Sequence, residues 1–286
     1  MTRNLIAAFS TFACGAVLAG LVLAQTSGAS FISSELAVTD IDPKHFNVQL
    51  VEGTFSFRGL PTLHAALPKK QVTVDAARID GTLDKVSKVV KTAKLTGGVT
   101  GTLDSLSADG PEHRTFSGSV VNYTNRGGAG EQSADLEVFG GAEFGSTNKT
   151  AKRTLTLRGS HGLFQLRQFT DKATGKKSIG LAGADLDGPV LLQFSGEQVD
   201  KKQKTTTPVA GEATGGHLTV SRPESGTNYV IRMSGGVHLV ETKGPNEGAE
   251  ITTTVVNLEF DATGVLINFS GEGETTTTVP PAKRRV

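Results

Sequence analysis

The chain of 286 residues contains one cysteine, no tryptophan and two methionines. With a single cysteine it cannot form an intrachain disulfide, so strand pairing and burial of apolar side chains must stabilise the fold. Lys plus Arg number 29 and Asp plus Glu number 28. This balance argues against a nucleic-acid partner, because such binding rests on clustered positive charge. The six histidines are scattered singly, without the short spacing of a metal-ligand pair, so no metal site is expected.

Glycine and threonine are abundant instead, with 35 residues of each. Threonine is enriched in strands and glycine collects at turns and strand ends. A helical bundle would favour Leu, Ala, Glu and Lys. The apolar fraction of 37% is too high for a wholly disordered chain. The composition therefore predicts an all-β protein.

The N-terminus has the pattern of an export signal. Arg3 precedes an apolar stretch at residues 5–23, and small residues follow. Cleavage after Ala24 is predicted, and an uncleaved inner-membrane anchor is the alternative because the stretch is near the length of a spanning helix. We expect residues 1–24 to be this signal or anchor, residues 25–50 an N-terminal segment, residues 51–271 a repeat β domain and residues 272–286 a disordered tail.

A short pattern recurs along the chain: apolar, any residue, apolar, any residue, glycine. Intervals near 20 residues, or twice that, indicate stacked supersecondary units. Alternation places both apolar residues of a copy on one face, and a glycine in mid-strand indicates a bend or bulge where the sheet curves. The copies, including two looser ones, end at Gly59, Gly97, Gly118, Gly140, Gly159, Gly196, Gly235 and Gly271.

Turn-forming sequences between the copies, such as Asp80-Gly81 and Asp187-Gly188-Pro189, predict roughly a dozen or more short strands. One segment fits a second interpretation. Apolar residues from Leu83 to Ala93 stand at helical spacing, so a short helix is the alternative there.

These repeats resemble the OstA-like family of the lipopolysaccharide-transport system, which includes LptA, LptC and the N-terminal domain of LptD. The resemblance rests on MSGGVHLV at residues 233–240, on the strand at residues 249–261, and on an earlier copy with VTVDAARID at residues 72–80 and LTGGV at residues 95–99. It covers about residues 50–271. It implies an open twisted antiparallel β-jellyroll, or β-taco, that stacks end to end and carries lipid acyl chains in the periplasm.

The candidate functional surface is the apolar stripe, and no catalytic motif is found. One interpretation is a closed sandwich core in which these side chains pack on each other. The other, which the resemblance implies, is an open groove that binds acyl chains. The stripe consists of Phe55, Phe57, Leu95, Phe116, Leu155, Leu157, Leu192, Phe194, Ile231, Met233, Val237, Leu258, Phe260, Ile267 and Phe269.

The expectation is thus a non-enzymatic envelope protein without a cofactor, which binds or conducts lipopolysaccharide or a related glycolipid in outer-membrane assembly. Its partners would be that lipid and other OstA-like proteins joined by end-to-end strand addition. Loop lysines such as Lys69-Lys70, Lys176-Lys177 and Lys201-Lys202 could meet lipid phosphates. One alternative is a structural or adhesive surface protein built as a β-solenoid. A carbohydrate-active enzyme is the other, disfavoured by the lack of tryptophan.

Overall fold

The structure is a computed structural model that describes residues 23–25, 28–32, 36–41, 47–49, 52–59, 62–67, 70–84, 90–107, 110–127, 133–170, 177–222, 228–261 and 265–279. The described part contains strands, turns and bends but no helix. All 18 strands belong to one sheet. In chain order the strands are β1 (Leu23–Gln25), β2 (Gly28–Ile32), β3 (Leu36–Ile41), β4 (Asn47–Gln49), β5 (Thr54–Arg58), β6 (Thr62–Leu67), β7 (Lys70–Asp75), β8 (Arg78–Leu83), β9 (Val90–Ser107), β10 (Gly110–Asn125), β11 (Ala134–Asn148), β12 (Arg153–Thr170), β13 (Lys177–Asp200), β14 (Thr205–Ser221), β15 (Tyr229–Lys243), β16 (Glu250–Phe260), β17 (Leu266–Glu272) and β18 (Thr276–Thr278).

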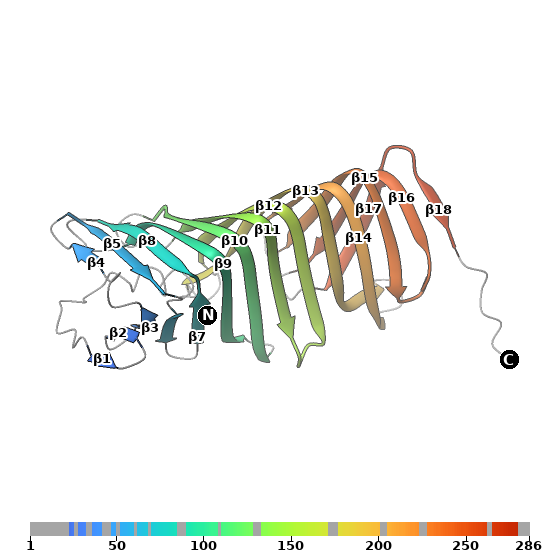
Figure 1. Ribbon diagram of the computed structural model, residues 1–286. Coiled ribbons are helices and arrows are strands. Elements are labelled where there is room, and N and C mark those ends of the chain that lie inside the picture. The colour runs from blue at the N-terminus through green and yellow to red at the C-terminus, as the bar shows by residue number, and fades with distance from the viewer. Residues whose placement is uncertain are drawn as a thin grey trace.

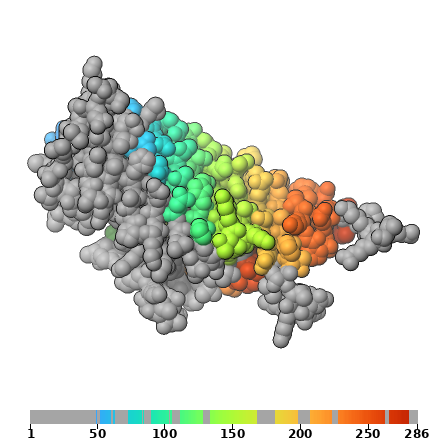
Figure 2. Space-filling view, turned by 90° about the horizontal axis from the view of Figure 1, so that it is seen from below, coloured from blue at the N-terminus to red at the C-terminus, as the bar shows by residue number. Residues whose placement is uncertain are grey.

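The sheet is folded lengthwise into two leaves. From β9 to β15 each strand is 15 to 24 residues long, and the strands follow one another along the long axis in chain order (Figure 1). Each of these strands shifts register near its middle, for example between Phe139 and Ala142 in β11. Such bulges bend a strand, and together they form one fold line, here called the spine. The same progression along the molecule is visible on its surface (Figure 2).

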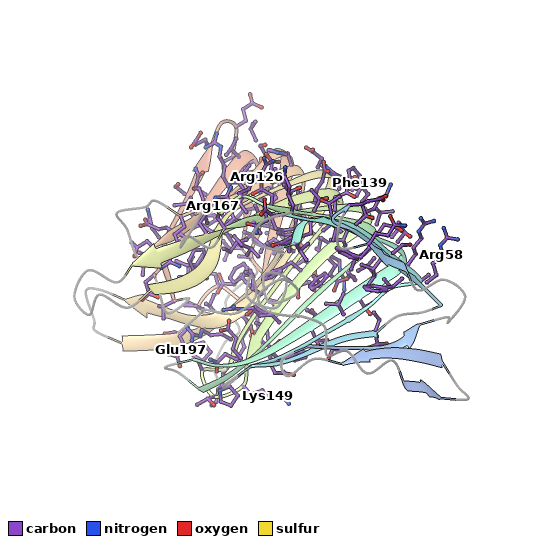
Figure 3. All side chains as sticks on the ribbon, turned by 90° about the vertical axis from the view of Figure 1, so that its left-hand side faces the viewer. Arg58, Arg126, Phe139, Lys149, Arg167 and Glu197 are labelled. Carbon is purple, nitrogen blue, oxygen red and sulfur yellow. The ribbon has the colours of Figure 1, made fainter. Side chains whose placement is uncertain are left out.

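Leaf A contains β4, β5, β8, β17, the first halves of β9, β11, β13 and β15, and the second halves of β10, β12, β14 and β16. Leaf B contains the other halves together with β1, β2, β3, β6, β7 and β18. Pairing is antiparallel except for one parallel bridge, between Gln198 and Leu266. Seen along the long axis, Arg58, Phe139 and Arg167 lie on one leaf and Lys149 and Glu197 on the other (Figure 3). The ends of the strands far from the spine form the mouth.

Glycines with positive φ make the corners of the spine. Strands that run from leaf A to leaf B turn at such a glycine, because the left-handed region suits a residue without Cβ. At five of these corners a Cβ would meet the corner residue of the preceding strand, which is small in every case. The pairs, glycine first, are Gly97 with Ala77, Gly140 with Ser119, Gly188 with Ser160, Gly235 with Gly216, and Gly273 with Thr254.

The core lies between the leaves. The row of leaf A nearest the spine is apolar or glycine in eleven successive strands, and the row of leaf B nearest the spine has the same character up to Val237, opposite which β16 has the buried Thr253. Phe144 of leaf B and Phe164 of leaf A have ring centroids 5.8 Å apart, and Phe194 of leaf B and Phe260 of leaf A have centroids 6.1 Å apart. The two leaves are therefore in direct contact through aromatic side chains. The leaf A row is Phe57, Ile79, Leu95, Val121, Val138, Gly162, Leu186, Leu218, Met233, Val256 and Gly271.

The prediction of an open, twisted antiparallel β fold is confirmed. The β-solenoid alternative is wrong, because neighbouring strands are antiparallel rather than parallel coils. The prediction of a dozen or more short strands is confirmed in number, since the described part of the sheet has 18 strands, and in length for β1 to β8, β17 and β18. It is wrong for β9 to β16, which are longer, because a glycine such as Gly188 bends β13 without ending it. Leu83, Val90 and Ala93 lie in strands rather than in the alternative helix, and Val86 and Val89 fall outside the described residues.

The sheet extends past both ends of the expected repeat domain. Strands β1 to β4 precede residue 51, and β18 pairs with β16 within the segment expected to be a disordered tail. Most of the expected signal or anchor falls outside the described residues. The described part of the chain contains no helix long and apolar enough to cross a lipid bilayer.

Candidate functional site: the inner face and its mouth

Fourteen of the fifteen stripe residues lie on the inner faces of the two leaves by strand alternation. Most of them are buried, and Phe116 and Leu155 are partly buried against the same core. Phe269 is the exception, with 38% of its surface exposed on β17, at the C-terminal end of the sheet. Leaf A contributes Phe55, Phe57, Leu95, Ile231, Met233, Leu258, Phe260 and Phe269, and leaf B contributes Phe116, Leu155, Leu157, Leu192, Phe194 and Val237.

The fifteenth residue, Ile267, is out of phase. A register shift between Glu259 and Phe260 places Leu266 opposite Phe260 and Phe269 opposite Leu258. Leu266 is therefore the buried residue of this strand, and Ile267 is only partly buried beside it.

The inner face of leaf B changes character from the spine to the mouth. Phe116, the apolar residue of β10, is followed toward the mouth by Arg114 and then Glu112 on the same face. Arg114 donates two hydrogen bonds to Glu112, from Nη2 at 2.7 Å and from Nε at 3.1 Å. Ser146 of β11 donates to the same carboxylate at 3.0 Å. The lining thus passes from aromatic to charged groups within three inward positions of one strand.

Two further arginines lie at the mouth on inward-facing positions. Arg153 begins β12 in leaf B, and Arg222 follows β14 in leaf A, two residues after the buried Val220. Burial lowers the pKa of Arg222, while the nearby Tyr229 opposes this shift. Burial raises the pKa of Tyr229 to about 12, and the charges of Arg153 and Arg222 oppose that shift in turn. The carboxylates of Asp261 and Glu112 act in the opposite sense to the arginines, so charged groups of both signs lie near one tyrosine at the mouth.

Tyr229 connects the charged mouth with the aromatic side chains of the core. Its ring stacks on Phe260, the opposing residue of β16, with centroids 5.2 Å apart and an interplanar angle of 13°. Phe260 in turn meets Phe194 of the other leaf edge to face. The charged mouth therefore continues directly into the apolar interior.

A cavity of about 650 Å³ lies beside strands β5, β8, β9, β10 and β11. Among the residues lining it is an outward-facing cross-strand row that consists of Ser56, Asp80, Lys94, Asn122 and Glu137. Ser56 donates to Asp80 at 2.7 Å, and Asn122 donates to Glu137 at 3.3 Å. Asp80 is also paired with Arg78. These polar groups satisfy one another, so we assign this hollow no chemistry.

Sequence reasoning missed the inward-facing arginines at the mouth. For Arg114 a signal was available, because it stands two residues before Phe116 and shares its face. The sequence of Asp185-Leu186-Asp187-Gly188 favours a turn over a calcium loop, and sequence reasoning missed that His217 joins both carboxylates on the outer face of leaf A, where the three side chains lie close enough to hold a metal ion. The lysine pairs proposed as phosphate contacts have side chains outside the described residues.

Comparison of the chain with protein-family models, with curated proteins and with solved structures gives no match.

Proposed function

We propose that this protein is a non-enzymatic carrier or binder of an amphipathic lipid, such as lipopolysaccharide or a related glycolipid, in the periplasm. The observation that carries the proposal is the graded lining, apolar along the spine and charged at the mouth, where three arginines lie on inward-facing positions. A phosphorylated glycolipid has the same polarity, with acyl chains at one end and anionic phosphates at the other. The resemblance to OstA-like proteins supports the same function.

The apolar part of the lining would supply most of the binding energy. Each acyl CH₂ moved from water into an apolar environment contributes about 0.8 kcal/mol. An acyl chain between the leaves must displace the Phe144–Phe164 and Phe194–Phe260 contacts that now join them. Lipid entry therefore requires the leaves to part at the mouth, where the parallel bridge between β13 and β17 is a single residue pair.

The arginines at the mouth would select the headgroup. The charge of Arg114 is already balanced by Glu112, so Arg114 would help to position the headgroup but adds no net positive charge to the mouth. Arg153 of leaf B and Arg222 of leaf A both lie near Tyr229, and we propose that one phosphate binds to both guanidinium groups in exchange for part of their present contacts. Both arginines are partly buried, and a partly buried arginine gains more from an anion than an exposed one does, because solvent screens the exposed charge.

The C-terminal end of the sheet suits the end-to-end stacking that the resemblance implies. Its last strand in leaf A, β17, pairs with β16 along one edge and touches β13 at one residue. The exposed Phe269 continues the apolar row of Ile231 and Leu258 to this end. A further strand added here would extend both the sheet and its lining.

Binding of a fluorescent lipid A derivative to the purified full chain tests the proposal. Replacement of Arg153 and Arg222 by Gln should weaken binding at least tenfold, by loss of the phosphate contacts. The matched control is Arg158→Gln, because Arg158 lies on the same strand but faces outward, toward Glu143. Equal binding by wild type, the double variant and the control would refute the phosphate assignment, and no binding by the wild type would refute the carrier function.

A structural spacer is the second candidate, favoured by the two aromatic pairs that close the interior. It predicts that the purified protein holds no lipid and takes up none when lipopolysaccharide is added. Native mass spectrometry of protein from an envelope extract, with lipid analysis of what co-purifies, separates the two candidates.

A further inference from the structure

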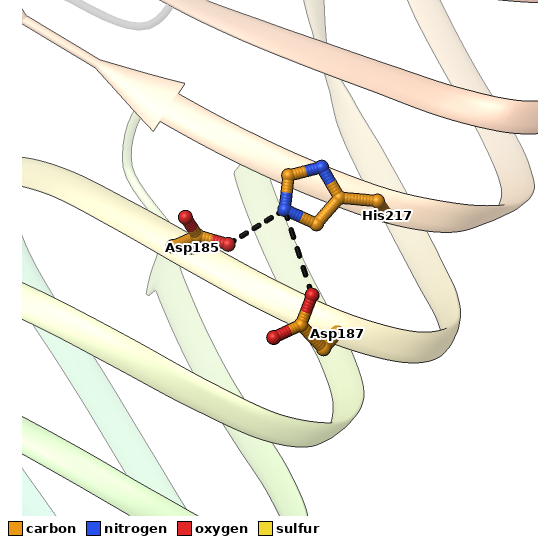
Figure 4. Close-up of side chains that lie close together, drawn as sticks. All are labelled: Asp185, Asp187 and His217. Carbon is orange, nitrogen blue, oxygen red and sulfur yellow. Dashed lines mark hydrogen bonds and ion pairs between the residues drawn. The ribbon is translucent and has the colours of Figure 1, made fainter.

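Three neighbouring strands place imidazoles and carboxylates side by side on the outer face of leaf A, next to the spine. His161 of β12 pairs directly with Asp187 of β13, and Asp187 pairs with His217 of β14. Asp185 lies two residues before Asp187 and therefore shares its face. Both carboxylates point toward the same nitrogen of His217 (Figure 4). This group lies on the opposite face of the sheet from the apolar lining.

The ligand atoms of the group have the separations of a small metal site. Nε2 of His217 lies 2.6 Å from Oδ1 of Asp185 and 3.7 Å from Oδ1 of Asp187. The three ligand atoms all lie within 4.8 Å of one another. Zinc bonds of 2.0–2.2 Å in a tetrahedral site put neighbouring ligand atoms about 3.3 Å apart. Rotation of exposed side chains is enough to reach that spacing.

The backbone holds Asp187 in place. Gly188, with a φ of +90°, makes the corner immediately after it. Ser160 of the preceding strand donates a hydrogen bond from Oγ to the Asp187 carbonyl at 2.8 Å. The backbone of Asp187 is therefore fixed by the spine, while its side chain keeps the freedom to rotate toward a ligand.

Two further polar side chains, His161 and Glu137, lie behind Asp187. His161 Nδ1 lies 3.6 Å from Asp187 Oδ2, and His161 Nε2 lies 3.4 Å from Oε1 of Glu137. The ring of Phe139 packs on the His161 ring with centroids 4.7 Å apart. Both contacts of His161 with the carboxylates are longer than hydrogen bonds, and His161 Nε2 has no hydrogen-bond partner. His161 and Glu137 are therefore polar neighbours of the ligand group, close enough to change its affinity for an ion through their charge.

We propose that Asp185, Asp187 and His217 bind a divalent transition-metal ion of the zinc type. The ligand set of one imidazole and two carboxylates favours zinc over calcium or magnesium, which take oxygen ligands. The Asp185, Asp187 and His217 side chains are 54%, 63% and 39% exposed, so an ion reaches them from solvent and water completes its coordination. The ion takes the place of the hydrogen bond between Nε2 of His217 and Oδ1 of Asp185. Bound there, it ties β13 to β14 beside the spine.

Isothermal titration of the EDTA-treated full chain with ZnCl₂ tests the assignment. We expect one site in the wild type, a loss of at least tenfold in affinity for His217→Gln and for Asp185→Asn, and a smaller loss for Glu137→Gln. The matched control is His113→Gln. His113 lies 2.6 Å from Asp104 in an exposed pair of the same kind, but no third ligand of the described chain joins that pair.

Two readouts keep the result independent of folding. Circular dichroism checks that each variant is folded, and Co²⁺ added to the wild type should give the visible absorption bands of a tetrahedral site with a nitrogen ligand. Zinc affinity that is unchanged in His217→Gln, lost equally in His113→Gln, or matched by calcium in the wild type would overturn the proposal. Absence of zinc binding by the wild type would overturn it as well.

Discussion

Two adjacent glycines at the corner of β15 provide a direct test of how the spine is built. Gly235 and Gly236 both have positive φ, +85° and +77°. A Cβ on Gly235 would lie 3.0 Å from Cα and 3.1 Å from N of Gly216, whereas a Cβ on Gly236 would have nothing within 4 Å. Replacement by alanine therefore imposes the same backbone penalty at both positions and a steric penalty at only one.

The magnitudes follow from these contacts. The left-handed conformation costs an L-residue about 1–2 kcal/mol, and the reduced entropy of the unfolded chain returns about 0.4–1 kcal/mol. Gly236→Ala should therefore destabilise the fold by about 1 kcal/mol. Gly235→Ala adds overpacking against the backbone of β14, which cannot rotate away, and such overpacking costs about 1–3 kcal/mol. The expected difference between the two variants is about 1–3 kcal/mol.

Equilibrium urea unfolding followed by far-ultraviolet circular dichroism measures the difference, since the chain has no tryptophan. The midpoint of Gly235→Ala should fall well below that of Gly236→Ala, with similar slopes for both. The corner of β9 offers a replicate, because Gly97 packs on Ala77 while Gly98 faces open space. Equal midpoints within both pairs of variants, or a larger fall in the midpoint at the second glycine of a pair, would refute the claim that each corner glycine packs against the corner residue of the preceding strand.

Three further outcomes are expected. Both tyrosines should resist ionisation, because burial raises the pKa of Tyr123 and raises that of Tyr229 to about 12. The free energy of unfolding should therefore fall as the pH rises from 10, the ordinary pKa of tyrosine, toward 12. Phenolate absorbance that appears near pH 10 in the folded protein would contradict this prediction. Leu157→Ala should cost about 2–5 kcal/mol in urea unfolding, since Leu157 is wholly buried, and a cost below 1 kcal/mol would show a loosely packed interior. Burial opposes ionisation of Asp80, but hydrogen bonds from Arg78 and Ser56 outweigh it and lower the pKa of Asp80. Asp80→Asn should therefore destabilise the fold at about pH 6, and the difference from wild type should shrink as the pH falls below 3.8. A difference in melting temperature that grows on acidification would refute this prediction.

The inner face could be predicted from the sequence because alternation in a strand is a local property. Fourteen of the fifteen stripe residues share that face, and Ile267 does not, since a register shift at Phe260 changes the phase of β17. Such a shift depends on the neighbouring strand and leaves no local signal. The bend at repeated glycines such as Gly97, Gly140 and Gly235 was predictable too. Gly196 is an exception, because β13 bends at Gly188 and pairs in continuous register through Gly196.

The length of the strands and the outer-face cluster could not be predicted in the same way. Asp187-Gly188-Pro189 has the composition of a turn, yet β13 continues through it because its neighbours bend at the same line. His161 and His217 are 56 positions apart in the sequence, as residue numbers show. Both histidines lie beside Asp187 only because of the register between neighbouring strands. The register of three strands must therefore be known before the cluster can be predicted.

Binding of lipid between the leaves can be tested with two single-tryptophan variants. Phe139 and Phe269 are each 38% exposed, but Phe139 lies on the outer face of leaf A and Phe269 on its inner face. Each is replaced by Trp in the otherwise tryptophan-free chain and titrated with a lipid brominated on its acyl chains. If lipid binds between the leaves, its bromine atoms should strongly quench the tryptophan fluorescence of Phe269→Trp and have little effect on that of Phe139→Trp. Equal quenching of both variants, or quenching of Phe139→Trp alone, would contradict it.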